Sequence, residues 1–281
     1  MAARRFTLAS AVVALILGLA SPALAGPWTR DPGRFYAKLS EGLYLANSFV
    51  DASGTLQEGV SYTGLTTALY GELGLIERFH VQLYVPYVLA ISTDSDDASF
   101  TRGGMGDGIL GVQYGLPIEA MPVAVRATLK MPLYARDSSL SERAFPVAGD
   151  GQIDSTLWLS AGTSLDAIAG WTYLEVGYQL RTEEYIGDDP LSERSYADTI
   201  RSTAQLGYGP GELVMLALTL DLALPLEDDS FTKAYFNGGL GAFFKWDKDS
   251  PWSIEANLDR TLWARNSSLG TAIGLGLSYQ H

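Results

Sequence analysis

Residues 79–89 read FHVQLYVPYVL, and side chains of two kinds alternate along this stretch. One face is apolar throughout and consists of Phe79, Val81, Leu83, Val85, Tyr87 and Leu89. The other face begins with His80, Gln82 and Tyr84. A period of two residues is typical of a β-strand that has different surroundings on its two sides. Roughly 9–11 residues are needed for a tilted strand to cross a lipid bilayer.

The same alternation recurs along the rest of the chain. It predicts strands at about 35–47, 61–73, 79–89, 105–116, 121–135, 152–165, 171–183, 198–208, 212–224, 234–246, 252–264 and 270–279. An even number of long strands, with the connections alternating between long and short, is typical of outer-membrane barrels. The sequence therefore predicts an all-β fold, a twelve-stranded antiparallel transmembrane β-barrel with both termini in the periplasm.

Tryptophans near the predicted strand ends support this fold, because aromatic girdles flank the apolar band of such barrels. They are Trp28, Trp171, Trp246, Trp252 and Trp263. The alternative is a soluble sandwich or lipocalin-like barrel, whose strands are usually shorter, about 5–6 residues. The long strands and the many charges on the polar face favour the membrane.

The first 25 residues have the features of a secretory signal peptide. Arg4 and Arg5 precede an apolar stretch from Leu8 to Ala20, and a small-residue cleavage pattern ends at Ala25. The apolar stretch is short for a helix that spans a bilayer. We expect residues 1–25 to be the signal peptide and 26–281 to form the barrel. The chain contains no cysteine, so a lipoprotein and a disulfide framework are both excluded.

The formal net charge is −13, and most of the acidic residues that cause it lie in the predicted outer loops. An acidic protein is a poor partner for the phosphate backbone of nucleic acid. The predicted partners are outer-membrane lipid and lipopolysaccharide, the barrel assembly machinery and a small-molecule solute. The predicted location is the outer membrane of a Gram-negative bacterium.

The polar faces of the strands place charges of both signs inside the predicted barrel. The candidate lumen-lining residues are Lys38, His80, Asp107, Arg126, Lys130, Asp154, Glu175, Arg181, Arg201, Asp221, Lys245, Glu255 and Asp259. They form either a water-filled lumen or an ionic network that fills a narrow barrel, since buried charges must be paired. Apart from His80 they number six of each sign, so we expect the acidic loops at the entrance to set any preference for cations. No cofactor and no metal site is expected.

Catalysis is disfavoured by the scarcity of general bases. His80 and His281 are the two histidines, and His80 alternates onto the lumen side. A barrel phospholipase would need a nucleophile and a base that reach the lipid. We therefore expect no enzymatic activity. Nine residues, 26–34, precede the first strand, which we expect to be too few for a plug.

Two local features depart from the simple pattern. Glu41 falls on the otherwise apolar face of the first strand, which indicates a bulge or a position at the rim. Residues 103–108 read GGMGDG but precede a strand and lack the lysine of a phosphate loop. These glycines more simply permit a bulge or a close approach of strands.

Two motifs resemble a known family. Gly74-Leu75-Ile76-Glu77-Arg78-Phe79 leading to Val85-Pro86-Tyr87, and Gly106-Asp107-Gly108-Ile109-Leu110-Gly111-Val112-Gln113-Tyr114, are similar to the outer-membrane barrels of the MetA-pathway phenol-degradation family, loosely called outer-membrane transporters. The resemblance implies a channel or uptake pore for small molecules, including hydrophobic or aromatic compounds, without a catalytic set. A structural or adhesive barrel without transport is the alternative.

Overall fold

The computed structural model describes residues 26–93, 99–134, 149, 151–182, 196–227 and 232–281. The predicted signal peptide lies outside these residues. Strands dominate the described chain: β1 Phe35–Val50, β2 Leu56–Ile76, β3 Phe79–Thr93, β4 Ser99–Met105, β5 Asp107–Gly115, β6 Val123–Pro132, β7 Asp154–Leu165, β8 Gly170–Arg181, β9 Thr199–Tyr208, β10 Val214–Pro225, β11 Ala234–Lys245, β12 Trp252–Arg265 and β13 Ser267–Gln280. Among these residues no helix is both long and apolar enough to cross a membrane.

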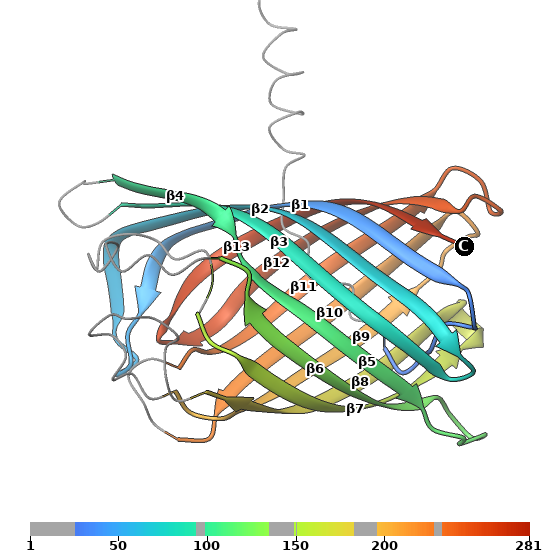
Figure 1. The fold of residues 1–281 in the computed structure, drawn as a ribbon. Coiled ribbons are helices and arrows are strands. Elements are labelled where there is room, and N and C mark those ends of the chain that lie inside the picture. Colours follow the sequence, from blue (N-terminus) through green and yellow to red (C-terminus); the bar gives the residue numbers. More distant parts are fainter. Residues whose placement is uncertain (1–25, 94–98, 135–148, 150, 183–195, 228–231) are drawn as a thin grey trace, which may run out of the picture.

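The strands form one closed antiparallel barrel (Figure 1). Apart from β4 and β5, strands that are neighbours in sequence pair with each other, and β1 pairs with β13 to close the ring. Both β4 and β5 pair with β3, because Gly106 interrupts what is otherwise a single strand. The barrel is therefore twelve-stranded, as predicted.

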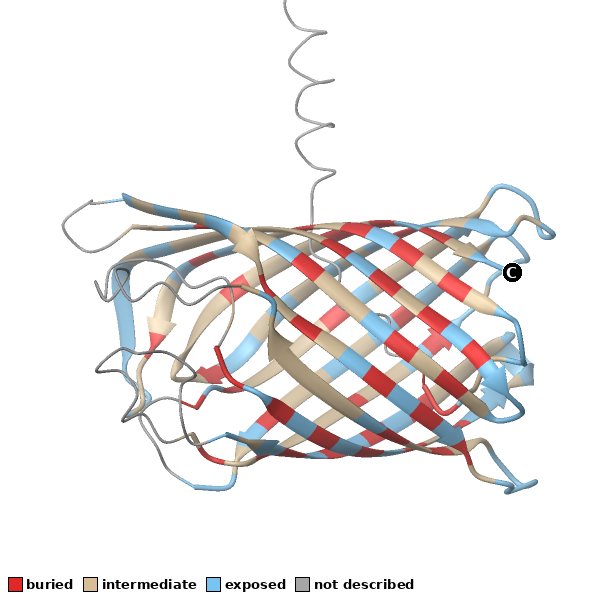
Figure 2. Ribbon diagram, viewed as in Figure 1, coloured by how far each residue is buried: buried red, intermediate tan, exposed pale blue. Residues whose placement is uncertain are grey.

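The two surfaces of the barrel wall differ in polarity because alternate side chains face opposite ways. In β7, residues 154–160 alternate strictly between buried and exposed (Figure 2). The exposed set is dominated by leucine, and Leu157, Leu174 and Leu240 are 60%, 52% and 61% exposed. Charged and amide side chains such as His80, Gln113 and Glu175 are fully buried. An apolar exterior around a polar interior is the arrangement of a membrane-spanning barrel.

The connections at one end of the barrel are short, and the C-terminus lies at the same end (Figure 1). At the other end, residues 133–153, 182–198 and 226–233 connect their strands by longer segments. Two connections at that end are shorter than the sequence suggested. β1 and β2 extend to residues 50 and 56, and Asn266 alone separates β12 from β13, with a φ of 52°.

The explanation predicted for Glu41 is wrong. Glu41 pairs in regular register with Thr67 on β2 and Leu275 on β13, and the irregularities of β1 come after Ala46. Its Oε1 accepts a 2.8 Å hydrogen bond from the Thr67 hydroxyl. The carboxylate therefore lies on the outer face in the middle of a strand.

The predicted aromatic girdle is confirmed for three of the five tryptophans. Trp246, Trp252 and Trp263 are exposed on the outer surface, and Trp252 packs edge-on against Tyr279. Trp171 instead faces inward and donates a hydrogen bond to Gln205, and Trp28 packs against Tyr173 inside the barrel. Sequence position at a strand end did not distinguish the two faces.

Candidate permeation pathway

The predicted lumen residues lie on the interior face but differ in burial. Lys38, His80, Arg126, Asp154, Glu175 and Glu255 are buried, whereas Asp107, Lys130, Arg181, Arg201, Asp221, Lys245 and Asp259 are partly accessible. The buried residues belong to β1, β3, β6, β7, β8 and β12, and the partly accessible ones to β5, β6 and β8–β12. Among the accessible residues Arg201, Asp221 and Asp259 border a cavity.

Buried ion pairs occupy part of the interior. Lys38 Nζ lies 2.5 Å from Glu255 Oε2. The other carboxylate oxygen of Glu255, Oε1, accepts a hydrogen bond from the Tyr36 hydroxyl. Arg126 pairs with Glu175, and the Arg126 guanidinium lies over the Trp158 ring, 4.8 Å from its centroid. Charge-assisted hydrogen bonds of this kind hold these side chains in fixed positions.

A second cluster lies toward the end with the long connections. The Asp154 carboxylate forms ion pairs with Lys130 Nζ, at 2.6 Å, and with Arg181 Nε, at 3.2 Å. Lys130 Nζ also lies 3.5 Å from Asp107 Oδ2. Gln152, in the connection before β7, accepts a hydrogen bond from Arg181. The predicted charges of four strands therefore meet in one network.

The segment before β1 enters the barrel at the opposite end (Figure 1). The Gln113 amide donates to the carbonyl oxygens of Gly26 and Trp28, at 3.0 and 3.4 Å. Arg30 Nε lies 2.6 Å from Glu72 Oε2, and the Arg30 backbone N–H donates to His80 Nδ1. The segment therefore occupies part of this end, and the expectation that nine residues are too few for a plug stays a prediction.

Each ring nitrogen of His80 has a polar neighbour, and a neutral imidazole accepts at only one of the two. Nδ1 accepts from the Arg30 backbone, and Nε2 lies 2.8 Å from the amide nitrogen of Gln82. The ring is fully buried. This geometry gives His80 a role in anchoring the N-terminal segment.

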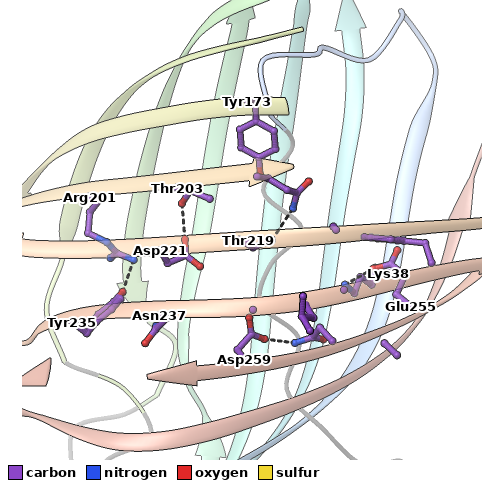
Figure 3. Close-up of a pocket in the computed structure, with 18 residues that line it drawn as sticks. Lys38, Tyr173, Arg201, Thr203, Thr219, Asp221, Tyr235, Asn237, Glu255 and Asp259 are labelled. Atoms are coloured by element: carbon purple, nitrogen blue, oxygen red, sulfur yellow. Dashed lines mark hydrogen bonds and ion pairs between the residues drawn. The ribbon is translucent and has the colours of Figure 1, made fainter. Parts of the chain in front are cut away.

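The strands β9–β12 border a cavity of about 300 Å³. Its wall includes Arg201, Asp221, Tyr235, Asn237 and Asp259 (Figure 3). Space is available because two neighbouring inward positions carry small residues: Gly241 lies opposite Ala217, and both border the cavity. This cavity is larger than the one of about 130 Å³ that is bordered by Gln82, Arg126 and Trp158 on the opposite side.

A second hollow, of about 440 Å³, lies at the end with the short connections. Four cationic side chains, Arg30, Arg34, Lys245 and Lys248, border it together with Asp31 and Asp249. Lys245 thus lies at the mouth of the barrel and away from the cavity of β9–β12.

Several interior residues were missed by sequence reasoning. Trp158 lies inward between Arg126 and Thr128, and Tyr235 receives a hydrogen bond from Arg201. Glu72 falls on the polar face of the predicted strand 61–73, so extending the alternation to that residue would have found it. Trp158 carries no such signal, because an aromatic ring suits either face of a strand.

No protein-family model and no curated protein sequence matches the chain. Several solved structures match it. The COG4313 outer membrane channel from Pseudomonas putida F1 superposes with a TM-score of 0.72 at 14% identity, over 94% of this chain and 100% of that chain. The translocator domain of the autotransporter NalP from Neisseria meningitidis gives a TM-score of 0.53 at 12% identity, over 100% and 97%. The NanC porin gives 0.50 at 10% identity, over 87% and 98%. The chain therefore has the fold of Gram-negative outer-membrane barrels.

Proposed function

We propose that the chain forms a passive channel for small polar solutes across the outer membrane of a Gram-negative bacterium. The observation that carries this proposal is the polar cavity bordered by β9–β12 inside a barrel whose outside is rich in leucine. Ligand pockets of small molecules begin at about this volume, roughly 300 Å³. The likeness to outer-membrane channels supports the proposal at the level of the fold.

The solute we propose is polar, in contrast to the hydrophobic or aromatic compounds that the family resemblance implies. Most of the residues in the cavity wall have a polar side chain, including three carboxylates and three amides, and Tyr173, Tyr235 and Phe243 are its aromatic members. A hydrocarbon would displace water from those polar groups, which costs free energy. Membership of the MetA-pathway family stays a proposal that rests on the motifs at 74–87 and 106–114.

In this proposal the ends of the barrel are assigned by their connections. Outer-membrane barrels have short periplasmic turns and longer outer loops. We therefore place both the N-terminal segment and the C-terminus on the periplasmic side, and the acidic long loops outside. Residues 26–31 then narrow the periplasmic end.

A structural barrel without transport is the second candidate, and the buried ion pairs Lys38–Glu255 and Arg126–Glu175 favour it because they occupy part of the interior. Single-channel recording of the refolded mature protein in a planar bilayer separates the two. We expect discrete conductance steps, together with heat-modifiable migration in detergent gels that reports the folded barrel. A folded, heat-modifiable protein without conductance would establish the structural barrel instead.

A further inference from the structure

The first residues after the predicted signal peptide are held inside the barrel. Gly26 and Pro27, which follow the predicted cleavage position, are both buried. The side-chain nitrogen of Gln113 donates hydrogen bonds to the carbonyl oxygens of Gly26 and Trp28, at 3.0 and 3.4 Å. Trp28 packs edge-on against Tyr173, with 6.2 Å between the ring centroids. An amide of β5 and a ring of β8 thus hold the start of the predicted mature chain between them.

The barrel wall leaves room for this segment at a glycine of β2. Gly74 is buried, and a Cβ there would lie 2.0 Å from the carbonyl oxygen of Asp31 and 2.7 Å from that of Arg30. Its backbone N–H donates to the carbonyl oxygen of Arg34, and its own carbonyl oxygen accepts from Gly33. A glycine in a strand permits another backbone to approach this closely. β2 therefore provides a docking position for the segment.

The first residue of the segment is confined in the same way. A Cβ on Gly26 would lie 2.8 Å from Cδ1 of Tyr173 and 3.0 Å from Cζ3 of Trp28, which is too close for a side chain. By standard bond lengths the backbone nitrogen of Gly26 lies about 2.5 Å from that Cβ position. The nitrogen therefore lies beside Tyr173, which belongs to the wall of the cavity bordered by β9–β12.

The surroundings of Gly26 favour a positive charge with several donors. The cavity wall that includes Tyr173 contains three carboxylates and two cationic side chains, namely Asp221, Glu255 and Asp259, and Lys38 and Arg201. The side-chain oxygen of Gln113, on the amide that binds Gly26, is buried and has no hydrogen-bond partner among the described residues. Buried polar atoms are normally hydrogen-bonded, and this oxygen is inaccessible to solvent, so its donor must come from chain already packed against it. An ammonium has three N–H donors and a positive charge, whereas a peptide nitrogen has one donor and no charge.

We propose that the barrel interior is a binding site for the chain's own processed N-terminus. Signal peptidase hydrolyses the Ala25–Gly26 peptide bond with one water molecule, which leaves a carboxylate on Ala25 and a free α-amino group on Gly26. An α-amino group is ordinarily protonated at neutral pH. The resulting ammonium is held between Gln113 and Tyr173, and it adds to the interior a cation that no side chain supplies. A residue retained before Gly26 replaces this ammonium with a neutral peptide group, so the segment binds less tightly.

The first measurement is the rate at which the α-amino group is acetylated in the refolded mature chain, made from a precursor whose cleavable leader leaves Gly26 first. Mass spectrometry compares the folded barrel in detergent with the same chain in urea. Lys248, exposed in the turn after β11, is the internal control. We expect Gly26 to react about tenfold more slowly in the barrel, because the segment must leave its site first, and Lys248 to change little. Equal rates for Gly26 in the folded and unfolded chains would overturn the site.

The second measurement tests the free amino group itself. A chain that starts at Leu24 keeps Gly26 but has a neutral peptide bond in front of it. Trypsin cleaves after Arg30, and release of the peptide that ends there reports how often the segment leaves the folded barrel. We expect release from the chain that starts at Leu24 to be about fivefold faster than from the mature chain. Equal rates of release would show that the ammonium contributes nothing and would overturn the proposal.

Variants of the barrel wall locate the site. Gln113→Met keeps the length of the side chain but removes the amide, so Gly26 should be acetylated at nearly the unfolded rate. Gly74→Ala places a Cβ against the backbone of Asp31 and should have the same effect. Gly71→Ala on the same strand is the matched control, since its Cβ would meet its nearest atom at 3.7 Å. Protection of Gly26 that persists in a heat-modifiable Gln113→Met barrel would reject the site, whether or not Gly74→Ala folds.

The inference does not depend on conduction, because acetylation and proteolysis are measured on the folded barrel. Absence of conductance in the folded parent would therefore reject the channel proposal and leave the binding site for the N-terminus to be decided by these two rates.

Discussion

Arg126 on β6 donates a hydrogen bond to the carboxylate of Glu175 on β8, across the strand that separates them. The two side chains are 2% and 0% exposed, so neither charge has water as an alternative partner. Removing one member of such a pair leaves an uncompensated buried charge, which costs about 3–5 kcal/mol.

We therefore predict that Arg126→Met and Glu175→Leu each destabilise the barrel by about 3–5 kcal/mol. The double variant should recover most of that loss, because it leaves no unpaired charge. Urea unfolding in lipid vesicles, followed by tryptophan fluorescence, measures all three. If the two losses of unfolding free energy simply add in the double variant, the two charges are independently solvated.

Alternation was enough to predict the fold and the face of most residues. Each strand must hide its polar side from lipid, so one face of β7 reads Leu157 and Leu159 while the other holds Asp154 and Ser160. Strand ends were less well predicted, because β3 continues with β4, and β1 with β2, as hairpins beyond the apolar band, where lipid does not constrain the alternation.

The pairing of interior charges could not be predicted from the sequence. Lys38 and Glu255 are 217 positions apart and meet because β1 and β12 flank β13 in a staggered barrel. Counting six interior charges of each sign led to the expectation that the entrance alone sets ion preference. That expectation stays a prediction; the structure adds that most of these charges are paired, whereas Asp221 and Asp259 form no ion pair among the described residues.

Arginine substitution on β10 tests which face meets lipid. Leu218→Arg should impair assembly more than Thr219→Arg, because arginine on the lipid face near the bilayer centre costs about 2–4 kcal/mol. Leu218 is 43% exposed on the outer surface, and Thr219 borders the cavity. The yield of heat-modifiable barrel measures assembly. Equal yields, or the reverse order, would contradict the assigned register.

A second pair of adjacent residues, Thr128 and Leu129 on β6, is less suitable for that test. Leu129→Arg is expected to impair assembly. Thr128→Arg, however, would disturb the hydrogen bond that Thr128 Oγ1 accepts from Trp158 Nε1. We expect both substitutions to reduce folding, because the Thr128 side chain is bound to Trp158 inside the barrel.

Shortening the mature N-terminus should widen the channel. Deleting residues 26–30 removes the groups that bind Gln113, His80 and Glu72 inside the barrel. We predict a larger single-channel conductance without loss of the folded barrel, since none of the deleted residues belongs to a strand. Arg30→Ala, which keeps the segment but loses the Glu72 contact, should give an intermediate conductance. Equal conductance in all three proteins would show that the segment does not limit the current.

The outward carboxylate of Glu41 should reduce stability. Its only protein hydrogen bond among the described residues comes from Thr67, and leucines such as Leu39 and Leu69 neighbour it on the outer face. Glu41→Leu should stabilise the barrel by about 1–2 kcal/mol, because a polar group is withdrawn from lipid. Thr67→Ala should have the opposite effect. Urea midpoints in vesicles measure both changes, and a less stable Glu41→Leu barrel would indicate that the carboxylate has a partner in the membrane.

Filling the cavity tests whether it conducts. Gly241 lies on the inner face of β11, and a Cβ added there would meet its nearest atoms at 3.7 Å, an ordinary contact. Gly241→Val should therefore fold normally while its side chain occupies space between Ala217 and Asn257, and we predict a clear fall in single-channel conductance. Ala242→Val on the same strand points to the outer surface and supplies the matched control, with conductance unchanged. The quantity to compare is the ratio of the two single-channel conductances, because any general effect of valine on the strand is common to both variants. A Gly241→Val barrel that conducts like its Ala242→Val control would place the path of the ions elsewhere in the interior.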